Sequence, residues 1–222
     1  MRRPTTCCPA PVRPWRRTRP TGRAGTAVAA TLALLTSLAG CAGGQQGRER
    51  KEVFVTREQP RQLPDVAFVD ADGRERTLAD YRGKGVLLNL WAPWCGPCAK
   101  EMPALDRLEA RLGGPDFEVV ALSIDKKGLP AARAFHESLG LEAIEPYADT
   151  ARQALFLLGP RGLPTTLLID AQGREVARAL GARRWDSPEV MAEIGRRLDL
   201  DEATVARAGI ASQPDLARVR AD

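Results

Sequence analysis

The sequence predicts an α/β domain in which a mixed β-sheet is flanked by helices on both faces. Short apolar runs of strand length alternate with segments of helical periodicity, as in βα units that feed parallel strands. Two later strands are joined by a tight turn, which adds an antiparallel pair. With 222 residues, 44% hydrophobic and 27% charged, the chain has the size and composition of one globular domain with appendages.

The expected elements begin with a hairpin, in which residues 66–69 and 74–78 flank the turn Asp70-Ala71-Asp72-Gly73. The continuous apolar run GVLLNLW at 85–91 is typical of a strand buried on both faces. A helix is expected over 95–112, because its apolar residues recur every three or four positions.

The second half of the domain continues the same alternation. Ser187 is expected to cap a last helix that runs to about Leu200, with Pro188 at its first position. Between the first helix and Ser187 we expect a strand at 117–124, helices at 130–139 and 150–158, and a hairpin of strands at 165–170 and 175–180.

The positive charge of the chain is confined to its leader. The formal net charge is +5, but residues 1–40 hold seven of the 33 basic residues and no acidic one. The remainder therefore has 26 basic and 28 acidic side chains. This balance gives no electrostatic support for a nucleic-acid partner, and none is expected.

Residues 1–40 are predicted to be a signal peptide of the lipoprotein type. An Arg- and Pro-rich stretch precedes 16 mostly apolar residues at 24–39, fewer than the roughly 20 that a spanning helix needs. The end, Leu38-Ala39-Gly40-Cys41, resembles a bacterial lipobox, in which the cysteine is acylated. Alternatives are an ordinary cleaved signal or a signal anchor. The pair Arg16-Arg17 lacks the flanking pattern of a twin-arginine signal.

The leader implies an extracytoplasmic protein that is lipid-anchored to a membrane through Cys41. Residues 41–62 are Gly-, Gln- and charge-rich and are predicted to form the lipidated N-terminus and a flexible tether. The folded domain is then expected over 63–200, followed by a polar tail at 201–222.

Only two of the five cysteines remain for chemistry in the folded domain. Cys7 and Cys8 leave with the leader, and Cys41 would carry lipid. Cys95 and Cys98 lie three positions apart, too close in sequence to staple a fold of this size. They follow a buried strand and open a helix, where open α/β sheets place their sites and where the helix dipole favours a thiolate. A redox dithiol is the expected function.

Other uses of the pair have less support. A structural zinc site needs about four cysteine or histidine ligands. After Cys41 the chain offers only Cys95, Cys98 and His136. Haem attachment needs a histidine after the second cysteine, where Ala99 stands. A structural disulfide remains an alternative. His136 itself is expected to be a solvated or capped histidine in the middle of a helix.

The segment around the pair resembles a known family. LWAPWCGPC at 90–98 is similar to the active-site segment of thioredoxins. The longer context, CAKEMPAL at 98–105, the leading hairpin and GLPTTLLID at 162–170, resembles the TlpA/ResA branch, with its nearest likeness to TlpA. These are membrane-tethered, extracytoplasmic thiol:disulfide reductases. The resemblance covers roughly 63–198 and implies a thioredoxin-like fold with an N-terminal β-hairpin.

The resemblance implies roles for further residues. Pro164 matches the cis-proline beside the dithiol, where it would present the Leu163 backbone to an extended substrate. Glu101, one helical turn past Cys98, matches the carboxyl group of the branch and is assigned to proton handling for Cys98; a solvated surface glutamate is the alternative. Asn89 stands where thioredoxins carry a buried aspartate. Trp94, Gly96 and Pro97 are expected to shape the surface beside Cys95.

The implied activity is reduction of client disulfides by the Cys95–Cys98 dithiol, with no other cofactor and no metal. The clients implied by the resemblance are apocytochrome c or the copper-site proteins of a respiratory oxidase. An integral membrane thiol reductant would restore the dithiol. Two alternatives stay open: a copper-binding assembly factor of the same fold, which would need His136, and a peroxiredoxin-like peroxidase.

Overall fold

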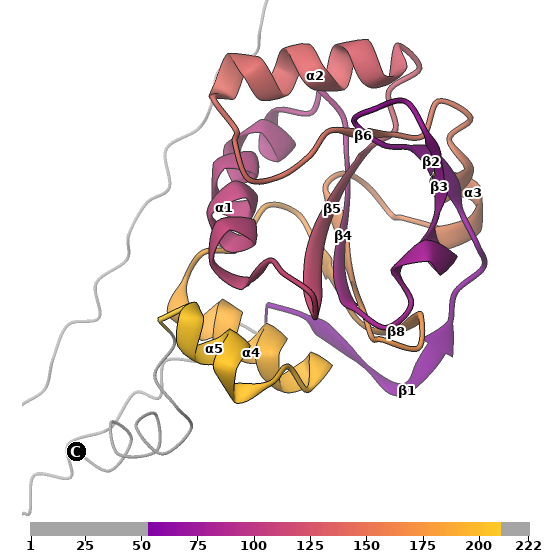
Figure 1. Ribbon diagram of the computed structural model, residues 1–222. Coiled ribbons are helices and arrows are strands. Elements are labelled where there is room, and N and C mark those ends of the chain that lie inside the picture. Colours follow the sequence, from indigo (N-terminus) through magenta and orange to yellow (C-terminus); the bar gives the residue numbers. More distant parts are fainter. Residues whose placement is uncertain (1–52, 210–222) are drawn as a thin grey trace, which may run out of the picture. The chain divides into compact units, whose positions relative to one another are not determined.

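The structure, a computed structural model, describes residues 53–209 and confirms the predicted α/β architecture (Figure 1). One mixed sheet of eight strands has the order β1-β8-β7-β4-β5-β6-β2-β3. Strands β4, β5 and β6 are parallel, and every other pair is antiparallel. Helices α1 and α3 lie on opposite sides of the central strands (Figure 1). The predicted signal peptide, Cys41 and the tether up to residue 52 lie outside the described residues.

The elements are bounded as follows. The strands are β1 (Val55–Gln62), β2 (Ala67–Val69), β3 (Glu75–Thr77), β4 (Gly85–Trp91), β5 (Phe117–Ser123), β6 (Tyr147–Ala148), β7 (Thr165–Ile169) and β8 (Arg174–Leu180). The α-helices are α1 (Gly96–Leu112), α2 (Gly128–Leu139), α3 (Gln153–Leu158), α4 (Pro188–Leu198) and α5 (Glu202–Arg207), and a 3₁₀ turn, η1, covers Leu78–Tyr81.

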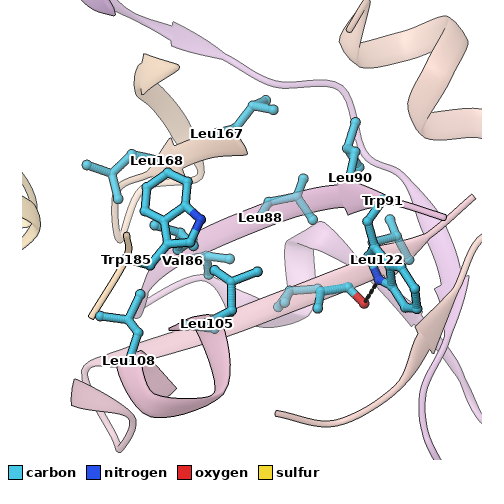
Figure 2. Close-up of a cluster of buried hydrophobic side chains, with 14 of the residues drawn as sticks. Val86, Leu88, Leu90, Trp91, Leu105, Leu108, Leu122, Leu167, Leu168 and Trp185 are labelled. Carbon is cyan, nitrogen blue, oxygen red and sulfur yellow. Dashed lines mark hydrogen bonds between the residues drawn. The ribbon is translucent and has the colours of Figure 1, made fainter. Parts of the chain in front are cut away.

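Strand β4 lies in the middle of the sheet, as its composition favours. Its residues are apolar except Asn89, whose side chain is hydrogen-bonded to Glu101 and Thr166. Each residue of the strand is buried, as the continuous apolar run predicts. Leu88 pairs with Val120 of β5 on one side and with Leu167 of β7 on the other. Figure 2 shows Val86, Leu105, Leu108 and Trp185 among the side chains packed on this strand and its neighbours. The core thereby fixes the carboxyl end of β4, from which the cysteine loop starts.

The two hairpin turns have the same construction. In the first, the Asp70 carboxylate accepts hydrogen bonds from the backbone N–H groups of Asp72 and Arg74, and Gly73 adopts a positive φ of 78°. Asp170 and Gly173 repeat this arrangement in the turn between β7 and β8. The aspartate side chain closes the turn and the glycine takes the left-handed conformation, so both turns follow from the local sequence.

The predicted tether, residues 41–62, is corrected at its end. Residues 55–62 form β1, which pairs antiparallel with β8 at the edge of the sheet. Phe54 is fully buried, and its ring lies 5.7 Å from that of Trp185. The polar composition of this strand concealed it, because an edge strand exposes most of its side chains: seven of its eight residues are exposed.

The predicted tail, residues 201–222, is likewise corrected at its start. Asp201 caps α5 by accepting a hydrogen bond from the Thr204 backbone N–H at 2.6 Å. Thr204 and Ala208 are buried, and α5 packs beside α1. Thr204 and Ala208 are the only buried residues among the described side chains of 201–209, too few to give an apolar periodicity in the sequence. Residues 210–222 lie outside the described part of the chain.

Two smaller differences concern the segment between β5 and β7. The helix expected over 150–158 begins only at Gln153, because Arg152 has a positive φ of 58°. The two-residue strand β6 was not expected; it joins β5 to β2 and so connects the first hairpin to the central sheet. No helix within residues 53–209 is long and apolar enough to cross a membrane.

Candidate active site

The two cysteines lie at the junction of β4 and α1, as the sequence predicts. Cys95 is the N-cap of α1, and its Sγ accepts a hydrogen bond from the Cys98 backbone N–H at 3.3 Å. Pro97 occupies the first turn, where its missing N–H leaves no helical bond unmade. The Cys98 N–H and the positive end of the helix dipole lie at the Cys95 sulfur, and both favour a thiolate there in the reduced protein.

The structure contains the oxidised form of this pair. The Cys95 and Cys98 sulfurs are bonded at 2.05 Å, and the two Cα atoms lie 5.2 Å apart. Cys95 retains 6% exposure, while Cys98 has none. Gly96 and Pro97 are exposed beside them, and Trp94 is 67% exposed. Cys95 is therefore the cysteine that an approaching molecule can reach, and Cys98 is buried behind it.

Glu101 is buried one helical turn beyond Cys98. Its side chain is 1% exposed, so the alternative of a solvated surface glutamate is wrong. Three donors hold the carboxylate: Asn89 Nδ2 at 2.8 Å on Oε1, and Trp185 Nε1 at 2.9 Å and the Arg183 backbone N–H at 3.0 Å on Oε2. Because the spacing of three residues places Cys98 and Glu101 on one helix face, the carboxyl group lies on the same side of α1 as the inner sulfur.

The electrostatics of Glu101 are a balance between burial and hydrogen bonding. Burial raises the pKa of Glu101 above its ordinary value, and the hydrogen bonds from Trp185, Asn89 and the Arg183 backbone oppose that rise. A carboxyl group with a raised pKa can hold a proton and release it again closer to neutral pH than an exposed glutamate can. The arrangement is therefore suited to proton transfer beside Cys98.

The hydrogen-bond partners of Glu101 were only partly foreseen. The sequence marks Asn89 because it stands where thioredoxins carry an aspartate, but it does not predict the hydrogen bond from Asn89 to Glu101. Its Nδ2 also donates to Thr166 Oγ1 at 2.9 Å, and its Oδ1 is buried without a partner among the described residues. Trp185 and Arg183 lie more than 80 residues from Glu101, and no local pattern marks them.

Leu163 and Pro164 lie at the same edge of the sheet as the cysteine loop. Leu90, near the end of β4, pairs with Thr165 at the start of β7, so the residues before Thr165 lie beside those after Leu90. The Leu163–Pro164 bond is cis, as the resemblance implied. Leu163 is half-buried and Pro164 is buried. The Pro164 carbonyl accepts a hydrogen bond from Gly181 N–H at 2.9 Å, which ties this loop to the segment that binds Glu101.

Two residues singled out in the sequence remain, Cys41 and His136. Cys41, the proposed lipid site, lies outside the described residues. His136 is not solvated as expected: it is 5% exposed, and its ring lies 5.7 Å from that of Trp91. Burial lowers the pKa of His136, so the neutral ring is favoured. No cluster of three or more potential metal-ligating side chains occurs among residues 53–209.

The chain is similar to known thiol-disulfide oxidoreductases. Residues 60–198 match the AhpC/TSA family. The thiol-disulfide oxidoreductase ResA of Geobacillus thermodenitrificans is 40% identical over 111 residues, which are 50% of this chain and 63% of that protein. ResA of Bacillus thuringiensis strain Al Hakam is 34% identical over 130 residues, 58% of this chain and 73% of that protein.

A solved structure gives the same result for the fold. The crystal structure of a Chlorobium tepidum chain named as a thiol:disulfide interchange protein DsbE superposes with a TM-score of 0.57 at 30% identity. The match covers 64% of this chain and 98% of that one. The chain therefore belongs to the AhpC/TSA family and, within it, to the thioredoxin-like thiol-disulfide oxidoreductases of the ResA type.

Proposed function

We propose that this protein reduces disulfides of client proteins outside the cytoplasm while it is tethered to a membrane through Cys41. The observation that carries the proposal is the pairing of an outer and an inner cysteine, with a buried carboxyl group one helical turn behind the inner one. Cys95 is at the helix N-terminus, Cys98 is fully buried, and Glu101 is held by three donors. An outer nucleophile, an inner resolving thiol and a proton acceptor are what a disulfide reductase needs.

The cycle begins with the reduced protein. The Cys95 thiolate attacks one sulfur of a client disulfide, forming a mixed disulfide and releasing the other client sulfur as a thiolate, which takes a proton from solvent. Cys98 then transfers its proton to the Glu101 carboxylate and attacks Cys95 Sγ. The second client sulfur leaves as a thiolate and is protonated through solvent, to which Glu101 later returns its proton. The client gains two electrons and two protons, and the protein is left with the Cys95–Cys98 disulfide.

The direction of transfer depends on the reduction potential. Thioredoxin has a potential of about −270 mV, whereas the oxidant DsbA has about −120 mV. Gly96-Pro97 between the cysteines is the dipeptide of the reducing end of this range, and membership of the ResA type points the same way. The protein is therefore proposed as an electron donor.

The proposed partners follow from the compartment. Outside the cytoplasm no glutathione pool restores the dithiol, so an integral membrane thiol reductant is the proposed electron source. The proposed clients are apocytochrome c or the copper-site proteins of a respiratory oxidase. The signal-like leader and the lipobox-like end at Cys41 support a location at the membrane surface.

Two alternative functions remain, and each requires a property of this protein that can be measured. A copper-binding role would need His136, which is buried against Trp91 and would have to leave that position. A peroxidase role is raised by the AhpC/TSA match. In that case the reduced protein would consume hydrogen peroxide at a rate comparable with its reduction of disulfides, and Cys95→Ser would abolish both.

The deciding measurement is the potential of the Cys95–Cys98 pair, determined by thiol trapping in defined redox buffers. A value below about −230 mV is expected for an electron donor. A value above about −160 mV would make the protein an oxidant or isomerase and would overturn the proposed direction. Peroxide consumption measured on the same sample separates the peroxidase alternative.

A further inference from the structure

The exposed apolar side chains of the protein are concentrated in one place. Within residues 53–209, six large apolar side chains are exposed, and four of these line a single groove between α3 and strands β1 and β8. They are Val55, Phe156, Leu157 and Leu180, and Phe156 is 82% exposed. The groove is open to solvent and has a volume of about 760 Å³, which accommodates several side chains of a bound polypeptide. A cluster of this kind marks an interaction surface.

The charges in this groove are unequal. Glu175, which has no exposure, is bonded by Arg57 at 3.0 Å, Arg61 at 3.1 Å and Arg178 at 2.7 Å. Burial would raise the pKa of Glu175, but the hydrogen bonds and charges of Arg178 and Arg57 lower it, so the carboxylate stays ionised. One negative charge is thus surrounded by three positive ones.

Two further charged residues line the groove, Glu58 and Arg161. Together with the Glu175 cluster they give four arginines against two glutamates. The groove therefore combines an apolar wall with an excess of two positive charges. An acidic partner is complementary to this excess, and a basic one is repelled.

The groove begins at the active-site edge of the sheet. Leu180 pairs with Thr165, the residue after Pro164, and Arg161 lies three positions before Pro164. Strand β8 is two strands from β4, a separation of about 10 Å at the usual spacing of 4.8 Å. Three or four residues of extended chain span this distance, at about 3.3 Å each. A polypeptide held at Cys95 could therefore reach the groove.

The edge of β1 itself is a poor template for an added strand. Pro60 lies within β1, and the pairing of β1 with β8 is irregular between Thr56 and Arg61. Proline and charged side chains are the usual means by which an edge strand avoids pairing with another chain. Recognition in the groove would thus be made by side chains and not by a continued backbone ladder.

We propose that the groove between α3, β1 and β8 binds a client segment in which an acidic residue adjoins an aromatic or aliphatic one, three or more residues from the cysteine that Cys95 attacks. This inference rests on the proposed function, because it assumes that the clients are polypeptides with disulfides. A groove lined by both apolar and charged side chains fits the protruding side chains of a polypeptide better than it fits the plane of a lipid headgroup layer.

The test compares two synthetic twelve-residue peptides, each with one cysteine in a mixed disulfide with thionitrobenzoate. Four residues from the cysteine, one carries Phe-Asp-Leu-Glu and the other Ser-Lys-Ser-Lys. The reduced full-length protein attacks the mixed disulfide, and the rate of release of the coloured thiolate gives kcat/KM. We expect the acidic peptide to react about ten-fold faster than the basic one, which corresponds to about 1.4 kcal/mol.

The variants locate the preference. Phe156→Ser should reduce the ratio of the two rates to within two-fold. Arg161→Glu, which leaves three arginines against three glutamates in the groove, should also reduce it. Leu139→Ser, which removes an exposed leucine of α2 outside the groove, should leave the ratio unchanged. The rate with oxidised mercaptoethanol, a small neutral disulfide, is measured for every protein as the reference.

Each outcome has a distinct meaning. Equal rates for both peptides, or a preference that survives both groove variants, would overturn the docking proposal even if oxidised mercaptoethanol is reduced normally. Failure to reduce any disulfide would instead refute the proposed function. Without a peptide preference, binding to phosphatidylglycerol vesicles or self-association that is lost in Phe156→Ser would assign the groove to a lipid surface or to a second copy, and would overturn the proposal.

Discussion

Trp185 donates its indole N–H to Oε2 of Glu101 at 2.9 Å, although 84 residues separate the two in the sequence. The indole is fully buried, and Figure 2 shows it among Val86, Leu108 and Leu168. The centre of the indole lies 5.7 Å from that of the ring of Phe54, which precedes β1. The core thereby holds in place a donor whose hydrogen bond tunes the carboxyl group beside the dithiol.

Replacing Trp185 with Phe should change the titration of Glu101 while an aromatic ring remains in the core. The hydrogen bond from Trp185 lowers the pKa of Glu101, so its loss should raise that pKa further above the ordinary value. Carbon-13 NMR of labelled glutamate carboxyl groups would follow the titration directly. In parallel, the pH at which the Cys95 mixed disulfide resolves quickly should move upward.

Trp94→Phe is the matched control for this substitution. It alters an exposed tryptophan next to Cys95 and should leave the carboxyl titration of Glu101 where it is in the unmodified protein. If Trp185→Phe also left that titration unmoved, the hydrogen bond would have no influence on the carboxyl group.

Glu101→Gln should produce a folded protein that resolves mixed disulfides slowly. The rate of resolution should no longer follow the ionisation of the side chain at position 101. The glutamine oxygen can accept from Trp185 and the Arg183 backbone, as Oε2 does now. Its amide group would face Asn89, whose Oδ1 is buried without a partner among residues 53–209 and can turn to accept it. The loss of stability should therefore be only about 1 kcal/mol.

Stopped-flow measurement of the resolution step from pH 5 to pH 9 checks this expectation. In the unmodified protein the rate should rise as Glu101 ionises, since only the carboxylate can accept the Cys98 proton. A Glu101→Gln protein with the same pH profile as the unmodified one would remove Glu101 from proton transfer.

Glu109 provides a prediction about stability that is independent of the active site. Burial raises its pKa to about 7, and its Oε2 accepts the Val119 backbone N–H at 2.7 Å. The folded protein retains this proton at pH values at which the unfolded chain has released it. The contribution of Glu109 to the free energy of unfolding is therefore complete below about pH 4.5 and is lost as the pH rises to about 7. Glu109→Gln keeps the hydrogen bond and removes the titration, so its stability relative to the unmodified protein should improve from pH 5 to pH 8.

The expected size of this difference is on the order of 2 kcal/mol, since partial solvent access reduces the effect. Urea denaturation of both proteins at pH 5 and pH 8 measures it. Glu137→Gln, at an exposed position of α2, controls for the change in net charge. A parallel pH dependence of Glu109→Gln and the unmodified protein would contradict the prediction.

Cys98→Ser should trap clients, whereas Cys95→Ser should not. Cys95 is the sulfur with residual exposure, and Cys98 is fully buried behind it, so only Cys95 can form the first bond to a client. Without Cys98 that bond cannot be resolved internally. Non-reducing electrophoresis followed by mass spectrometry of the adducts would identify the clients. Equal trapping by both single variants would contradict the assigned order of attack.

The sequence alone determined the parts of this protein that depend on neighbouring residues. The apolar run of β4, the cap at Cys95, the two Asp-x-x-Gly turns and the cap at Ser187 are each decided within about ten residues, and the structure has all of them. The dithiol was predictable for the same reason, because a strand followed by a capped helix places both cysteines on one helical turn.

Only the tertiary structure decided what surrounds the dithiol. The donors to Glu101 come from β4 and from the segment after β8, and packing of the core, not local pattern, brings them together. The same is true of β1, whose exposed edge position gave no apolar alternation, and of the groove beside α3. Long-range contacts depend on how whole elements pack. Side chains that meet across the fold therefore produce no local periodicity in the sequence from which the contact could be predicted.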